Sequence, residues 1–154
     1  MTDPANIDRF DLDRFVMAQQ TTYDRALTEL RHGRKTSHWM WFIFPQVAGL
    51  GRSETARHYA IGSIEEAQAY LAHPLLSARY RECVGVLDTL EGTTADAVFG
   101  AVDAAKLRSS LTLFIEAAPD EPFFATAIQR WFGGERDQRT IDILATSETG
   151  GKLP

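Results

Sequence analysis

Cysteine is scarce in this 154-residue sequence, which contains only Cys83. A single cysteine can form neither an internal disulfide nor a cysteine-built metal site, and this favours a reducing compartment. Long apolar runs are also missing, because no stretch approaches the roughly 20 apolar residues of a membrane span. The first residues, 1–13, are polar and acidic, unlike a secretory signal. We therefore expect a cytoplasmic protein without a membrane segment.

Several catalytic and cofactor motifs are absent. The sequence has no GxSxG elbow, no HExxH zinc motif and no GxxxxGK(S/T) phosphate loop. His38, His58 and His73 are separated by 20 and 15 residues, which matches no compact spacing of metal ligands. Cys83 lies on the apolar face of a predicted helix, where it is expected to act as a small hydrophobe. The sequence thus predicts neither a metal nor a cofactor.

Basic residues are outnumbered by acidic ones, since 16 lysines and arginines stand against 21 aspartates and glutamates, a net charge of −5. This balance excludes a protein that coats nucleic acid through bulk charge. The charge is uneven, because residues 31–58 hold five lysines and arginines and one glutamate, a local +4 that leaves −9 for the remainder. A basic segment in an acidic chain indicates a focused site for a small anion.

Helical signals occur along most of the chain, whereas alternating strand patterns are scarce. Ser63 and Asp103 are candidate N-caps, and Pro74 suits the first turn of a helix. We expect helices near residues 12–30, 63–71, 74–90, 94–99, 103–117, 123–132 and 137–145. The sequence predicts one mainly α, multihelical domain over residues 11–145, with an N-terminal tail at 1–10, a disordered C-terminal tail at 146–154 and at most a minor strand pair near 38–44.

An aromatic run, SHWMWFIFPQ at residues 37–46, places two of the three tryptophans at alternate positions. Burial statistics favour the core for Phe42, Ile43 and Phe44. A tryptophan ring can also stack on a nucleotide base, so Trp39 and Trp41 are candidate ligand contacts.

A glycine-containing loop follows this run. Gly49 and Gly51 permit close backbone approach, Arg52 offers a bidentate clamp for phosphate or carboxylate, and Ser53 can cap the next helix. The loop lacks the third glycine and the preceding strand of a dinucleotide-binding fingerprint. An ordinary turn with a surface arginine is the alternative interpretation.

A third candidate feature lies on the helix expected at 103–117. Asp103, Lys106 and Ser110 are three and four residues apart and are therefore neighbours on one helical face. A lysine beside an acid and hydroxyls can bind phosphate or a sugar hydroxyl, or act as an electrophile. A capped helix with a solvated ion pair is the alternative interpretation.

Several of these segments together resemble a known family, the small bacterial proteins classed as domain of unknown function 1810. The similarity extends over nearly all of residues 11–145 and implies a mostly α-helical single domain, without implying an established activity. The matching segments include residues 33–46, Gly49-Leu50-Gly51-Arg52-Ser53, Tyr70-Leu71-Ala72-His73-Pro74, Phe99-Gly100 with Asp103 and Lys106-Leu107, and residues 109–114.

A looser similarity concerns the NADAR (NAD and ADP-ribose associated) family, whose members include N-glycosidases acting on ribosylated substrates. Residues 70–76 and Val98-Phe99-Gly100 are similar to a helix pair and turn of that family. The similarity implies a nucleotide-derived ligand.

The leading hypothesis is binding of an ADP-ribose-like anionic ligand and hydrolysis of its N-glycosidic bond. Departure of the base from ribose creates an oxocarbenium-like centre, which needs a carboxylate and a proton donor. The candidate catalytic residues are His38, Asp103 and Lys106. The candidate ligand-binding residues are Lys35, Ser37, Trp39, Trp41, Gln46, Gly49, Gly51, Arg52, Ser53 and Ser110.

Two alternatives stay open. The chain can be a noncatalytic helical module that binds a protein or peptide through its aromatic and basic surface. The tryptophans can also be purely structural, in which case Trp39→Ala unfolds the protein at a cost of about 3–5 kcal/mol. The sequence does not determine the oligomeric state.

Overall fold

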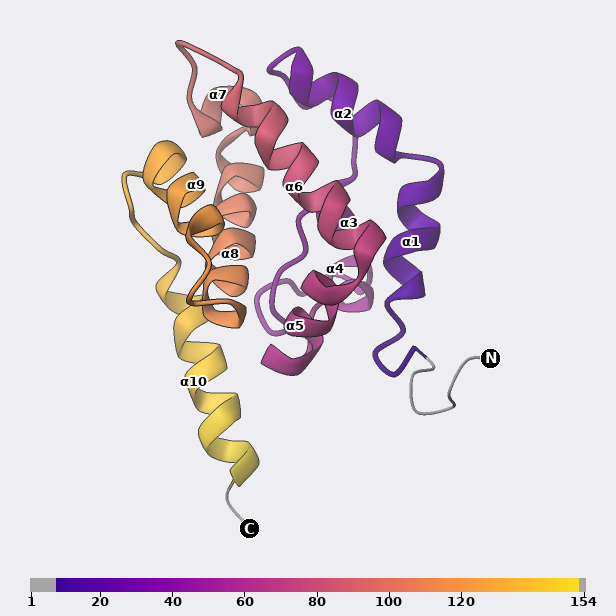
Figure 1. Cartoon of the computed structure of the whole chain (residues 1–154), viewed down its shortest axis with the longest axis vertical. Coiled ribbons are helices and arrows are strands. Elements are labelled where there is room, and N and C mark those ends of the chain that lie inside the picture. Colours follow the sequence, from indigo (N-terminus) through magenta and orange to yellow (C-terminus); the bar gives the residue numbers. More distant parts are fainter. Residues whose placement is uncertain (1–7, 153–154) are drawn as a thin grey trace.

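The structure is a computed structural model that describes the backbone of residues 8–152 and the side chains of residues 8–146. In this part of the chain it contains ten helices and no sheet, which confirms the expected single mainly α domain (Figure 1). The helices are α1 (Asp13–Gln20), α2 (Tyr23–Arg31), α3 (Met40–Ile43), α4 (Glu54–His58), α5 (Ile64–Ala72), α6 (Pro74–Asp88), α7 (Ala95–Phe99), α8 (Ala101–Ala117), α9 (Pro122–Phe132) and α10 (Gln138–Lys152).

Most helix starts follow their capping residues. The Ser63 hydroxyl accepts a hydrogen bond from the Glu66 backbone N–H and begins α5, as predicted. Pro74 is the first residue of α6, where its missing N–H removes no helical hydrogen bond. The Asp137 carboxylate accepts from the Thr140 N–H at 3.1 Å and begins α10.

Two expected helix boundaries are wrong. The helix predicted over residues 12–30 divides into α1 and α2 at Thr21 and Thr22, where adjacent β-branched residues disfavour a continuous helix. The helix predicted from Asp103 begins earlier, at Ala101, because Gly100 turns the chain with a φ of +81°. Asp103 therefore lies in the first turn of α8, and its carboxylate does not cap the helix.

Residues 38–44, where the sequence allowed at most a minor strand pair, contain the short helix α3 instead. Packing overrides the β-propensity of the aromatic residues, and Trp39, Met40, Ile43 and Phe44 are all buried. The one strand-like pairing in the described residues is an isolated parallel bridge between Val47 and Ile61.

Helix α8 is the centre of the packing. It contacts α5, α7, α9 and α10, and both its polar and apolar residues are buried along much of its length. In Figure 1, α8, α9 and α10 lie on one side of the molecule, α1 and α2 lie on the other, and α6 crosses between them. Tyr80 of α6 links the segment after α3 to α8 and α9, because its ring contacts Phe44, Phe114 and Phe124 edge-on.

The domain was predicted to extend from residue 11 to residue 145. In the structure the first helix begins at Asp13 and the last helix ends at Lys152. Residues 1–7 and 153–154, and the side chains of 147–152, lie outside the described part of the chain. Of the C-terminal tail predicted as disordered at 146–154, residues 146–152 belong to α10, while the N-terminal tail at 1–10 stays a prediction.

A buried carboxylate holds the start of the aromatic run in place. Glu29 of α2 is 8% exposed and accepts hydrogen bonds from the backbone N–H groups of Thr36 at 2.8 Å and Ser37 at 3.0 Å. It also accepts from the Ser37 hydroxyl and, at 2.9 Å, from the indole N–H of Trp39. Burial alone raises the pKa of Glu29, but these four hydrogen bonds outweigh it and lower the pKa from 4.5 to about 2. Glu29 is thus ionised in the folded protein at neutral pH.

We predict that Glu29→Gln lowers the free energy of unfolding at pH 7 by about 2–3 kcal/mol. The folded protein holds the Glu29 pKa below its ordinary value, so this stabilisation is present above about pH 4.5 and is lost as the pH falls towards 2. Urea unfolding followed by circular dichroism between pH 7 and pH 2.5 measures it.

The variant's stability should fall less steeply with acid than that of the wild type. The exposed Glu91 provides the control, because Glu91→Gln leaves the wild-type slope unchanged. Equal slopes for the wild type and Glu29→Gln would contradict the assignment.

Candidate functional site

Three charged side chains form an ion-paired cluster. The Lys35 ammonium lies 2.8 Å from one carboxylate oxygen of Asp103, and the Lys106 ammonium lies 3.4 Å from the other. The side chains of Lys35, Asp103 and Lys106 are 7%, 21% and 28% exposed. Two ammonium groups around one carboxylate leave an excess positive charge, which attracts an anion. The structure thus brings together three of the residues predicted from the sequence.

The local backbone brings this cluster together. The Lys35 N–H donates to the carbonyl of Val98 in α7 at 2.8 Å, and Glu29 binds the next two backbone N–H groups. Helix α7 ends at Gly100, which leads directly into α8 and its first-turn residue Asp103. The position of Lys35 relative to Asp103 therefore depends on contacts made by its own backbone.

The two tryptophans of the aromatic run have different environments. Trp39 is 0% exposed, and its indole N–H donates to Glu29, so the prediction that it stacks on a base is wrong: no face of its ring is accessible. Trp41 is partly exposed, and the Lys106 ammonium lies 5.4 Å from its ring centroid. A cation over an indole face is attracted to it, so Trp41 borders the ion-paired cluster.

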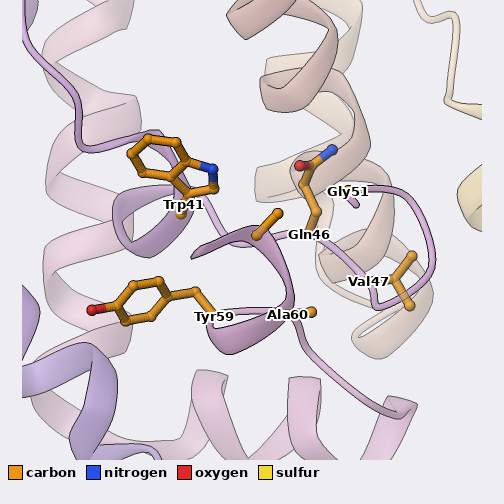
Figure 2. Close-up of a pocket in the computed structure, with 7 residues that line it drawn as sticks. Trp41, Gln46, Val47, Gly51, Tyr59 and Ala60 are labelled. Atoms are coloured by element: carbon orange, nitrogen blue, oxygen red, sulfur yellow. The ribbon is translucent and has the colours of Figure 1, made fainter. Parts of the chain in front are cut away.

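A small pocket lies next to this cluster (Figure 2). Its volume is about 240 Å³, including the part open to solvent. Three of its residues were predicted from the sequence, namely Trp41, Gln46 and Gly51. Four were missed: Val47, Ala56, Tyr59 and Ala60. Figure 2 shows the rings of Trp41 and Tyr59 on one side and Gln46, Val47 and Gly51 on the other.

The glycine loop forms part of the pocket wall. Gly49 has a φ of +105°, and a Cβ at Gly51 would lie 2.5 Å from the Cβ of Ala56, so the loop requires glycine at both positions. The Ser53 hydroxyl accepts from the Ala56 N–H at 3.0 Å and caps α4, as predicted. Arg52 is exposed beyond the loop and lies outside the pocket lining.

The remaining predicted residues lie outside the cluster and the pocket. Ser110 is 0% exposed, and its hydroxyl is 2.9 Å from that of Tyr80, so core burial contradicts its proposed contact with a ligand. The Ser37 hydroxyl and N–H are both bonded to Glu29, which leaves it a structural role. His38 is exposed, and it makes no contact with Asp103 or the pocket in the described residues.

Glu29 and Tyr59 are the important residues that sequence reasoning missed. Glu29 lies on an amphipathic helix that also carries exposed acidic residues, and the neighbouring sequence does not show that Glu29 is the buried one. For Tyr59 the only hint in the sequence is its position. It follows the glycine loop and a short helix, so the chain can fold back there and bring Tyr59 close to the aromatic run.

In the residues that the structure describes, no three His, Cys, Asp or Glu side chains lie close enough together to hold a metal ion. None of the described helices combines the length and the apolar character needed to cross a membrane.

The family described as "Protein of unknown function (DUF1810)" matches residues 9–144. The chain belongs to the DUF1810 family. A crystal structure of the conserved hypothetical protein Rv1873 from Mycobacterium tuberculosis is similar in sequence and fold, with 48% identity and a TM-score of 0.87. That match covers 90% of this chain and 99% of the other. No protein with a curated description matches the chain.

These findings confirm the resemblance to the DUF1810 family. They do not concern the NADAR family, so that similarity stays a prediction, as do the activity and the ligand.

For this DUF1810 protein we predict that its tryptophans differ in their contribution to stability. Trp39→Ala removes a fully buried ring and a hydrogen bond to Glu29, so it should lower the free energy of unfolding by about 3–5 kcal/mol. Trp41→Ala removes a partly exposed ring and should cost about 1–2 kcal/mol. Urea titrations of both variants make the comparison, and a larger loss at Trp41 would contradict the assignment of Trp39 to the core.

Proposed function

We propose that this DUF1810 protein binds a small anionic, nucleotide-derived ligand at the cluster of Lys35, Asp103 and Lys106, beside Trp41. The observation that carries the proposal is the pairing of two lysines with one carboxylate next to a partly exposed indole. Excess positive charge suits a phosphate or carboxylate, and the indole suits a flat ring. The looser similarity to the NADAR family favours an ADP-ribose-like ligand, and we place the protein in the cytoplasm.

The reaction that we propose at this site is hydrolysis of the ligand's N-glycosidic bond. Water adds to C1 of the ribose and gives up one proton, and the C1–N bond breaks with its electron pair going to nitrogen. A base bound through a neutral nitrogen takes up a proton as it leaves, so H and OH are added across the bond, whereas a positively charged base such as that of NAD leaves neutral and the proton from water is released. Asp103 can orient a ribose hydroxyl or the water, and the Lys106 ammonium can donate the proton. Lys106 suits this role better than His38, because it contacts Asp103 directly.

The pocket volume limits what the site can enclose. The pocket is shallow, because its volume of about 240 Å³ includes space open to solvent, and it is too small to enclose a drug-sized ligand. We therefore propose that only one part of the ligand enters the pocket, and that its charged part lies over the exposed edge of the lysine cluster.

We predict that ADP-ribose raises the thermal unfolding midpoint of the protein. At a ligand concentration of about 100 Kd the stabilisation is about 2.7 kcal/mol, or several degrees. Lys106→Gln should reduce this shift by at least about half. The matched control is Arg25→Gln, which removes one exposed positive charge on α2 and should keep the wild-type shift.

Ribose 5-phosphate, NAD and inorganic phosphate complete the series. If none of these compounds shifts the midpoint at 10-fold above a millimolar Kd, about 10 mM, the proposed function is overturned. A protein- or peptide-binding role is then the better interpretation of the same surface.

Turnover is a separate prediction. Incubation with NAD or an ADP-ribosylated base should release the free base, measured by chromatography, and Asp103→Asn and Lys106→Gln should each lower the rate by about 100-fold or more. Binding without release of base would overturn the hydrolysis and leave a binding function.

A further inference from the structure

The two lysines that pair with Asp103 differ in their surroundings. The Lys35 ammonium lies 2.8 Å from one carboxylate oxygen, and its side chain is 7% exposed. The Lys106 ammonium lies 3.4 Å from the other oxygen, and its side chain is 28% exposed. A hydrogen bond between an ammonium and a carboxylate is usually about 2.7–2.9 Å long, so Lys35 forms such a bond with Asp103 while Lys106 is held less closely.

Lys35 is held from the protein side by Trp39. Its ammonium lies 5.0 Å from the centroid of the Trp39 ring, which is 0% exposed and donates its N–H to Glu29. The backbone of Lys35 is also fixed, because its N–H donates to the carbonyl of Val98 at 2.8 Å. An ammonium that is attracted both to a buried indole and to a carboxylate has little freedom to turn towards a ligand.

Lys106 lies at the surface of the same cluster. Its ammonium is 5.4 Å from the ring centroid of Trp41, which is partly exposed. Val102, one helical turn earlier on α8, is 73% exposed, so this part of the helix is open to solvent. An anion can therefore reach Lys106 without displacing a buried group.

The three charges add up to one uncompensated positive charge. Lys35 cancels the charge of Asp103, so the charge of Lys106 is left to attract an anion. Without Lys35, the Asp103 carboxylate would cancel Lys106 instead and would also repel the anion. Lys35 can thus control anion binding without any contact with the anion.

From this geometry we infer that Lys35 is a positioning residue of the ligand site. It holds and neutralises Asp103 without touching the ligand, and Lys106 is the cation that binds the ligand's anionic group. When the anion binds, Lys106 exchanges its weaker pairing with Asp103 for the anion. The inference rests on the proposed function, and it replaces the ligand contact predicted for Lys35 with an action through Asp103.

The test compares the wild type with Lys35→Met, Asp103→Asn and the double variant that carries both changes. Methionine and asparagine are uncharged and close in shape to the side chains that they replace. The double variant therefore loses a whole ion pair and keeps the wild-type net charge, a replacement that is often neutral for stability.

Inorganic phosphate is the probe, because it carries the negative charge without the ribose that Asp103 is proposed to orient. It is titrated at constant ionic strength into the ¹⁵N-labelled full-length protein. The indole N–H signal of Trp41 reports binding, since this ring lies next to Lys106. Affinity is measured rather than turnover, because the double variant lacks the Asp103 carboxylate that turnover needs.

We expect Lys35→Met to weaken phosphate binding by about 10-fold and the double variant to bind within about threefold of the wild type. If Lys35 touched the anion, the double variant would also bind about 10-fold more weakly than the wild type, and this result would overturn the inference. The decisive comparison needs only the wild type and the double variant, so it does not depend on the folding of Lys35→Met. The dispersion of the amide spectrum verifies that the double variant is folded.

The matched control combines Lys35→Met with Asp96→Asn, which removes an exposed carboxylate on α7. This pair of changes has the same net charge as the double variant but leaves Asp103 ionised and without Lys35. It should bind phosphate as weakly as Lys35→Met, because a solvent-exposed charge has little effect on the site. Recovery of wild-type affinity in this control would show that net charge alone matters, and it would overturn the inference.

The outcomes separate this inference from the proposed function. If ADP-ribose binds in a manner that depends on Lys106 but the double variant stays weak towards phosphate, the role of Lys35 is wrong and the proposed function stands. If phosphate does not move the Trp41 signal of the wild type, the inference is overturned, and the binding of ADP-ribose decides the proposed function by itself. If no anion binds, both are overturned.

Discussion

The buried carboxylate of Glu29 is the interaction on which the site depends. Burying a charge is costly unless hydrogen bonds replace its hydration, and here four donors from residues 36–39 do so. These donors belong to the segment that follows Lys35, so satisfying the carboxylate also fixes the backbone of the lysine that reaches Asp103. The same contact holds Trp39 in the core.

The aromatic run therefore serves two purposes. Trp39, Ile43 and Phe44 are buried in the core, where Trp39 and Phe44 contact Phe99 of α7 and Phe44 also contacts Tyr80 of α6. Trp41, two residues after Trp39, lies instead between the ion-paired cluster and the pocket. A short helix rather than a strand makes this division possible, because one helical turn directs side chains to several sides while a strand offers two faces.

The Val47–Ile61 bridge and Arg14 hold in place the two pocket-lining segments around Val47 and Tyr59. Backbone hydrogen bonds join the loop after the aromatic run to residue 61 at both Gln46 and Ala48. Arg14 of α1 donates to the carbonyls of His58 and Ala60 and pairs with Glu66 at 2.7 Å. The loop that carries Tyr59 is thus tied to two helices. A site built from loops needs such support to keep its geometry.

Local signals were enough to predict most helices. Ser63, Pro74, Gly100 and Asp137 act through their own backbone and side-chain chemistry, and each lies at a helix end as its chemistry requires. Local signals failed at Thr21-Thr22, where a continuous apolar period concealed a break, and at residues 38–44, where packing overrode β-propensity.

The sequence by itself determined that the chain forms one mainly α domain and that its basic and aromatic residues are concentrated at residues 31–58. Periodicity, capping and charge are properties of neighbouring residues, so one chain is enough to show them. Only the tertiary structure decided which tryptophan faces a pocket, that Ser110 lies in the core, and that Glu29 and Tyr59 matter. Whether a side chain is buried or paired depends on residues distant in the sequence. The local sequence therefore does not show which of two similar side chains becomes buried.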